Sequence, residues 1–184
     1  MRVIYMMTCY VAAAFMVGCT HMTPTYQESV DNVNKLQAAG KASVNVGNFT
    51  GKNELQRLSA RANSFTSPYN DSFSEYIREA LRLELVRAGI LDTNSPVTIE
   101  GVLEANDLDI GVEVGLQNIS VRFIVRRNPK VIYEKIITTQ HRWGSAFIGA
   151  VAIPMARDAY PAAVSKLFSQ LFSDPEFIAA IRGG

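Results

Sequence analysis

The chain has 184 residues, of which 48% are hydrophobic, with 18 basic side chains, 17 acidic side chains and two cysteines. This length suits one domain with a substantial core and is short for two. The charges nearly cancel and form no basic stripe, whereas the phosphates of nucleic acid attract clustered lysine and arginine. We therefore expect no nucleic-acid partner.

The first 18 residues have the pattern of a secretory signal peptide. Arg2 is followed by an uncharged run from Val3 to Val17, and the small residue Gly18 stands directly before Cys19. A basic start, a short apolar run and a small residue at the cleavage site are typical of such a leader. A membrane-spanning helix needs about 20 apolar residues, more than this run holds, so a cleaved leader is favoured over an uncleaved anchor.

The junction Met16-Val17-Gly18-Cys19 resembles the bacterial lipobox, although Met16 stands where leucine is most frequent. The resemblance implies cleavage between Gly18 and Cys19 and attachment of lipid to Cys19, which would become the first residue of the mature protein. Thr20 follows the cysteine, whereas an aspartate there favours inner-membrane retention in enteric bacteria. We therefore expect a lipid-anchored outer-membrane protein whose domain faces the periplasm.

Removal of this leader would leave a chain without a free thiol. Cys9 lies in the leader and Cys19 would carry the lipid, so no cysteine remains for a disulfide, a metal or a nucleophile. Residues 19–40 are mostly polar and predict a tether, which at about twenty residues reaches at most roughly 65 Å. Residues 41–184 are then predicted to form a single periplasmic domain.

The domain begins with a predicted strand and helix. Apolar and polar residues alternate from Lys41 to Phe49, which is typical of a half-buried strand. The sequence Ser72-Phe73-Ser74-Glu75 has the form of a capping box, and apolar residues then recur at spacings of three and four up to Gly89. These features predict a helix over 73–88.

After Pro96 the pattern changes back to a period of two. It predicts three antiparallel strands, with a turn at Arg127-Asn128-Pro129-Lys130 between the second and the third. Glu100 and Glu104 would then face Arg122 and Arg126 across neighbouring strands, as ion pairs on the polar face.

The last third is predicted to be helical, with Pro154 and Pro161 expected to start, kink or divide the helix. Asp174-Pro175-Glu176 predicts the start of a short terminal helix, with aspartate as its cap. The fold class is therefore α/β (α+β): a two-layer sandwich in which two main helices cover a mostly antiparallel sheet, in the order β-α-β-β-β-α.

Several segments together resemble a group of uncharacterised proteobacterial envelope lipoproteins, and the architecture is similar to that of YajG-type lipoproteins. The segments are Ser67 to Tyr69, Tyr76 to Gly89, Val97 to Asp107, Arg122 to Val125, Ser145 to Pro154 and Leu171 to Phe177. The resemblance covers about 41–180. It implies an outer-membrane lipoprotein, and its motifs are structural, so it implies no catalytic residue.

Three candidate sites for chemistry are weaker than their structural alternatives. Asp107 to Glu113 places acidic residues at every second position but lacks the polar spacers and the final glutamate of a calcium loop, so we expect no metal and no cofactor. His141 could be the base of a hydrolase, yet no motif supplies a nucleophile for it. Ser145 is interpreted as a helix cap rather than a nucleophile.

A partner surface is predicted in two segments that carry aromatic or apolar side chains. They are Tyr69, beside Pro68, and the stretch from Trp143 to Pro154 with Phe147 and Ile148. Aromatic residues concentrate binding energy at interfaces. The run from Ala146 to Ala156 could instead be the buried start of a helix, which we favour over an exposed contact surface.

These features predict a non-enzymatic binding or assembly module, attached to the membrane through its lipid and able to bind an envelope protein. The alternatives are a periplasmic hydrolase that uses His141 and a transport-accessory lipoprotein that binds a lipid or small ligand.

Overall fold

The structure is a computed structural model that describes residues 19–182. The predicted leader, Cys9 and Gly18 lie outside the described residues. Between residues 19 and 182, no helix has the length and apolar character needed to cross a membrane.

The main sheet has four strands, in the order β2-β5-β6-β7. They are β2 (Asn45–Gly51), β5 (Val97–Ile110), β6 (Val114–Arg127) and β7 (Lys130–Gly144). The three long strands are antiparallel, as predicted, and β2 pairs parallel with β5. The predicted turn at 127–130 joins β6 to β7.

The alternation of side chains along these strands separates the core from the outer face of the sheet. Ile99, Phe123 and Val125 are fully buried under the helices. On the outer face, the Arg126 guanidinium lies 2.9 Å from the Glu100 carboxylate. The Arg122 guanidinium lies 2.7 Å from the Glu104 carboxylate. Both predicted cross-strand ion pairs are therefore present.

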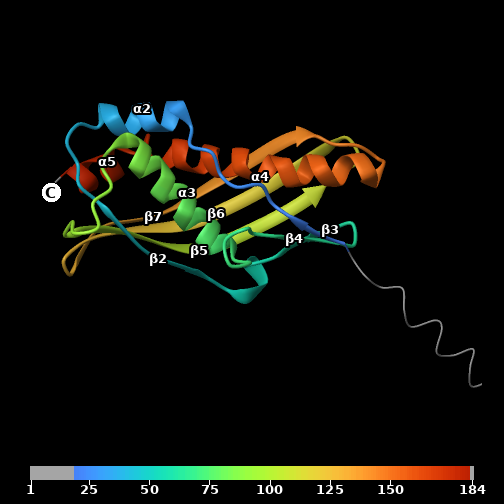
Figure 1. The fold of residues 1–184 in the computed structure, drawn as a ribbon, viewed down its shortest axis with the longest axis horizontal. Helices are drawn as coiled ribbons and strands as arrows, with labels where there is room; N and C mark the ends of the chain where they lie inside the picture. The colour runs from blue at the N-terminus through green and yellow to red at the C-terminus, as the bar shows by residue number, and fades with distance from the viewer. Residues whose placement is uncertain (1–18, 183–184) are drawn as a thin grey trace, which may run out of the picture.

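Two helices cover the inner face of this sheet, α3 (Phe73–Ala88) over β2 and β5 and α4 (Gly149–Leu171) over β6 and β7 (Figure 1). The capped helix over 73–88 is confirmed. The Ser72 hydroxyl accepts a hydrogen bond from the Glu75 amide at 3.2 Å, and Gly89 ends the helix in the left-handed region with φ 75°. The Glu75 carboxylate bonds with Arg78 instead of closing the capping box.

Helix α4 is continuous, with Pro154 and Pro161 inside it. The two prolines therefore do not divide the helix. Its apolar face packs on the sheet, and Val164, Leu167 and Phe168 on it are completely buried. The terminal helix α5 (Pro175–Arg182) begins as expected, with the Asp174 carboxylate accepting a hydrogen bond from the Glu176 amide at 3.0 Å.

The first part of the described chain adds elements that the sequence did not predict. A small sheet has the order β1-β4-β3, from β1 (Thr20–Met22), β3 (Leu58–Ala60) and β4 (Asn63–Thr66). A short 3-10 helix η1 (Asn53–Leu55) precedes β3, and helix α2 (Val30–Ala38) lies on the outer side of α3 and α4.

The prediction of a polar tether over 19–40 is wrong for the described residues, because this segment packs on the domain. Tyr26 and Leu36 are buried. The buried carboxylate of Glu84, on α3, accepts hydrogen bonds from the Tyr26 hydroxyl, from the Ser29 amide at 3.0 Å and from the Asn32 side chain at 3.3 Å. Polar side chains and backbone groups of this segment therefore hold it on the domain through buried hydrogen bonds.

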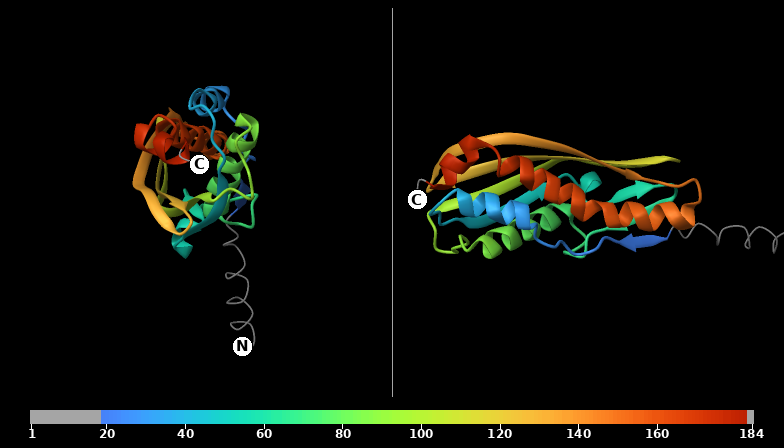
Figure 2. Two further views of the ribbon diagram at one scale, coloured as in Figure 1. Left: turned by 90° about the vertical axis from the view of Figure 1, so that its left-hand side faces the viewer. Right: turned by 90° about the horizontal axis from the view of Figure 1, so that it is seen from above.

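The molecule is elongated along its three long strands (Figures 1 and 2). One end, which we name the tip, contains the β5–β6 turn, the β7–α4 loop and the beginning of β1. The β6–β7 turn and the last residues of α3 lie at the other end, which we name the far end.

Candidate functional site

Cys19, the predicted lipidation site, lies exposed at the tip, directly before the first strand. Its carbonyl accepts a hydrogen bond from the Ser64 amide at 3.1 Å, and β1 then continues in parallel register with β4. A group attached to Cys19 would therefore be joined to the small sheet without an intervening linker.

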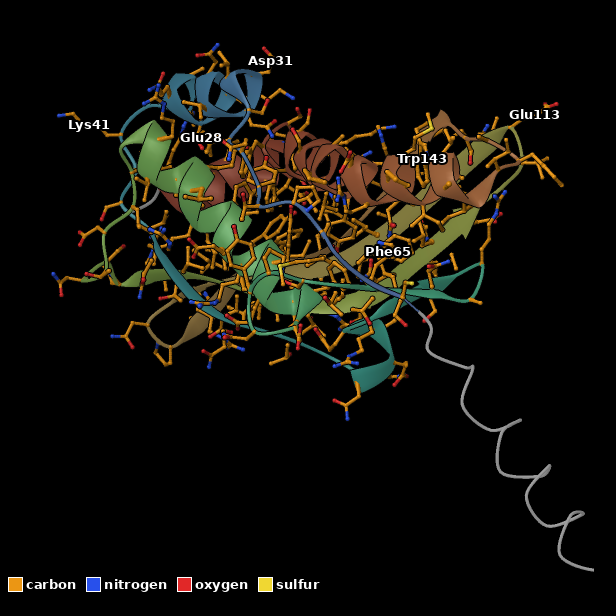
Figure 3. All side chains as sticks on the ribbon, turned by 45° about the vertical axis from the view of Figure 1, so that its right-hand side comes forward. Glu28, Asp31, Lys41, Phe65, Glu113 and Trp143 are labelled. Atoms are coloured by element: carbon orange, nitrogen blue, oxygen red, sulfur yellow. The ribbon has the colours of Figure 1, made fainter. Side chains whose placement is uncertain are left out.

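Of the four residues predicted as a partner surface, Tyr69 and Trp143 pack against the core. The Tyr69 ring meets the buried Tyr76 ring edge-on, with centroids 5.4 Å apart. Trp143 lies over Gly115, where a Cβ atom would approach the indole ring to 2.2 Å. Gly115 therefore provides the space for this ring, which lies between the sheet and α4 (Figure 3).

Phe147 and Ile148 are exposed, with 81% and 64% of their surface accessible. They lie in the β7–α4 loop, just before α4 begins. The run from Ala146 to Ala156 is thus amphipathic: Ala152, Ile153 and Ala156 are buried, whereas Val151 and Met155 are exposed. The favoured expectation of a buried helix start is therefore met on one face of the first turns of α4 only, because Val151 and Met155 on them are exposed.

Arg61 holds the two loops of the tip together. It lies in the β3–β4 turn, and its guanidinium donates to the carbonyls of Ile110 and Gly111, both at 2.9 Å, and to those of Ala146 and Phe147, at 3.0 and 3.1 Å. The planar guanidinium can donate in several directions at once. Sequence reasoning missed this residue because all four acceptors are backbone atoms that are distant along the chain.

His141 and Ser145 do not form a catalytic pair in the described part of the chain. The Ser145 hydroxyl has no hydrogen-bond partner and is therefore not bonded to His141. Partial burial and the nearby Lys166 ammonium lower the pKa of His141. Ser145 is not the helix cap that we expected, since α4 begins at Gly149 with Ile148 in the cap position, and the Ser145 hydroxyl is buried without a partner.

The acidic segment from Asp107 to Glu113 closes β5 and enters the β5–β6 turn. The Asp107 carboxylate accepts a hydrogen bond from the Asn118 side chain at 3.3 Å, and Glu113 stands at the tip (Figure 3). Within residues 19–182 there is no group of three potential metal ligands.

No protein-family model and no curated protein sequence matches this chain. Solved structures share its fold. A Xanthomonas campestris protein of the family DUF330 superimposes with a TM-score of 0.55 at 10% identity, covering 89% of this chain and 96% of the other. A candidate lipoprotein from Caulobacter crescentus has a TM-score of 0.47 at 12% identity, and the match covers 81% of this chain and 95% of the other. A minor lipoprotein from Acinetobacter baumannii has a TM-score of 0.38 at 12% identity, and the match covers 70% of this chain and 91% of the other. At 10% identity the likeness to the Xanthomonas protein is one of fold alone, and the resemblance to YajG-type lipoproteins remains a prediction.

Proposed function

We propose that this protein is a lipid-anchored accessory protein of a bacterial envelope, which binds another envelope component and catalyses no reaction. The observation that carries the proposal is the position of Cys19. It follows a leader-like apolar run in the sequence, is exposed, and stands one residue before the first strand. We further propose that the anchor lies in the outer membrane and that the domain faces the periplasm.

Replacement of Cys19 by alanine tests the anchor. We expect the variant to accumulate as an unprocessed precursor without acyl label, because the thiol that accepts the lipid is absent. Labelling with a radioactive fatty acid and the electrophoretic mobility of the full chain measure both effects. Normal cleavage together with acyl labelling of the variant would contradict the assignment.

The outer strand β7 supports the binding role. Among residues 19–182 it pairs with β6 alone, so within this part of the chain one edge of the 15-residue strand has no strand partner, and Ile136 on it is 50% exposed. An unpaired strand edge offers its backbone groups to another chain. Val86, on α3, is 49% exposed and provides a matched control.

A photo-crosslinking amino acid at position 136 tests this role in intact cells, with the same substitution at position 86 for comparison. We expect a discrete crosslinked product at 136 and none at 86. The absence of a crosslinked product at 136, or equal amounts of product at 136 and 86, would contradict binding along β7.

A further inference from the structure

We propose that the tip of the molecule, next to Cys19, enters the surface of the lipid bilayer, so that the apolar side chains of the fold itself contact lipid beside the anchor. The inference rests on the proposed function for the anchor and adds a second, non-covalent membrane contact. Its occupant is the acyl and headgroup boundary of a bilayer.

The tip carries six exposed apolar side chains that form one apolar tip cluster. They are Val112, Val114, Phe147, Ile148, Val151 and Met155. Exposed apolar residues are ordinary when they are scattered, whereas a contiguous group marks a contact surface.

Hydrogen bonds place the members of this cluster side by side. The Ser145 amide donates to the Glu113 carbonyl at 2.8 Å, which joins the β7–α4 loop to the β5–β6 turn. The Arg61 guanidinium joins the same two segments through Gly111 and Phe147. Ile148 in the cap position and Val151 and Met155 on the first turns of α4 follow at spacings of three and four, and all three are exposed. The hydrogen bonds thus join the two segments from which the cluster is built.

Further hydrogen bonds, through Arg61 and the residues that follow it, connect the cluster to Cys19. The Cys19 carbonyl bonds to the Ser64 amide, and the Asn63 side chain, one residue earlier, bonds to the Arg61 carbonyl at 2.8 Å and lies 3.0 Å from the His21 ring. Figures 1 and 2 show the start of β1 and the start of α4 at one end of the molecule. The chain that precedes the fold therefore joins it at the end that carries the cluster.

This junction is the reason why a bilayer, rather than a protein, is assigned to the cluster. Under the proposed function, the lipid that holds the protein in the membrane is attached to Cys19 itself, directly after the apolar run Val3 to Val17. One residue spans at most about 3.6 Å. Since β1 begins at Thr20, the tip cannot stand away from the membrane to which Cys19 is attached.

The charged groups at the tip limit the depth of entry. Glu113 stands exposed between Val112 and Val114, and Arg142 is exposed near the end of β7. Charged side chains are tolerated near the membrane interface and are costly at its centre. Shallow entry, with phenylalanine and aliphatic side chains among the headgroups, is the mode of interfacial membrane contacts.

The experiment uses the lipidated protein, extracted from cells and reconstituted in vesicles of phosphatidylethanolamine and phosphatidylglycerol. Cys9 leaves with the leader and Cys19 is acylated, so a single introduced cysteine can carry an environment-sensitive fluorophore. The labelled variants are Phe147→Cys and Val151→Cys at the tip and Val86→Cys near the far end. Val151 and Val86 are matched, because both are helical valines with 49% exposure.

Lipids brominated on their acyl chains are expected to reduce fluorescence at 147 and 151 at least twofold and to leave 86 unchanged. Equal quenching at all three positions, or none at 147, would overturn the proposal. A label at 147 that is shielded from water but not quenched by bromine would show that protein covers the cluster, which also overturns it.

Acyl labelling of the same samples separates this proposal from the anchor. Acylated protein without quenching at 147 contradicts the membrane contact and leaves the anchor intact. Protein that retains its leader and carries no acyl label also exposes Cys9 and Cys19 to the fluorophore. Quenching of the Phe147→Cys sample beyond that of the same protein without an introduced cysteine then supports the membrane contact and contradicts the lipidation of Cys19.

Discussion

The buried carboxylate of Glu84 fixes the N-terminal segment to the helical layer. One of its oxygens accepts all three hydrogen bonds from Tyr26, Ser29 and Asn32, while the other is buried without a partner. Burial, followed by the neighbouring Glu84, raises the pKa of the Tyr26 hydroxyl, so this group remains a donor at physiological pH. The segment is therefore part of the folded domain and contributes to its stability.

Replacing Tyr26 by phenylalanine removes this hydroxyl and keeps the ring in the core. We expect the free energy of unfolding to fall by about 1–3 kcal/mol, because a buried acceptor loses a donor. Urea denaturation measures the change, and Gln27→Ala, at the exposed neighbouring position, serves as the control. Equal stability of the Tyr26→Phe variant and the parent protein would indicate a segment that does not pack on the domain.

His141 gives the protein a predictable dependence on pH. The pKa of the folded state is lowered, first by burial and then by Lys166. As pH falls below the ordinary histidine value of about 6.5, the unfolded state binds the proton first. Stability is therefore lost as pH decreases from that value through the folded pKa.

The test compares the free energy of unfolding at pH 7.5 and pH 5.0 for the parent protein and for His141→Gln. Other groups titrate equally in both proteins, so the difference between them isolates the imidazole. We expect the parent protein to lose more stability than the variant, and an identical loss would contradict the lowered pKa.

Among the elements, the sequence predicted best those whose determinants are local. Helix α3 has its cap, its apolar stripe and its terminal glycine within 18 residues, and the long strands repeat a two-residue pattern over much of their length, with a register shift after Leu103 in β5. The cross-strand ion pairs followed from that pattern. Helix α5 was predictable because Asp174 and Pro175 stand next to each other at its start.

The missed elements depend on contacts between distant residues. Strand β1 exists because it pairs with β4, about forty residues later, and three residues are too few for a sequence pattern. Helix α2 docks through the buried Val33 and Leu36 and through polar groups, with the Lys35 ammonium bonded to the Ser169 hydroxyl on α4 at 2.7 Å. Two buried apolar residues in an otherwise polar segment form too short a pattern to predict such docking. Of the four residues predicted as a partner surface, Phe147 and Ile148 are exposed although a buried helix start was favoured for their segment, and the packing of Trp143 on the core depends on the distant Gly115.

Arg61 makes the tip a testable structural unit. We expect Arg61→Lys to destabilise the protein by about 1–3 kcal/mol, because hydrogen bonds to charged groups are lost and an ammonium cannot reproduce the guanidinium fork. Amide hydrogen exchange should become faster at Gly111 and over 146–148 and stay unchanged in α3. Arg57→Lys is the matched control, since Arg57 is exposed and lies 4.0 Å from Asp71. Unchanged exchange at 146–148 would contradict the role of Arg61.

At the scale of the whole molecule, the long strands separate the tip, with Cys19, from the far end. Strands of 14 and 15 residues span about 45–50 Å at roughly 3.3 Å per residue. The proposed anchor point lies at one end of this length, and the free edge of β7 runs along it. A molecule fixed at its tip would extend β7 away from the membrane, where a second protein can reach it.

Energy transfer to acceptor-labelled headgroups measures this orientation in the lipidated, reconstituted protein. A donor on Glu113→Cys, at the tip, should transfer strongly, and one on Asn128→Cys, at the far end, weakly, because about 45 Å of strand separates the two positions. Equal transfer from both would indicate a molecule that lies flat on the bilayer.

Insertion of ten glycine and serine residues between Cys19 and Thr20 provides a second experiment, which tests what holds the tip at the bilayer. If the covalent anchor alone holds the tip at the bilayer, the linker abolishes the difference between the donors. If the apolar tip cluster also enters the lipid, as we propose, the difference persists with the linker and disappears when Phe147 and Ile148 are both replaced by aspartate.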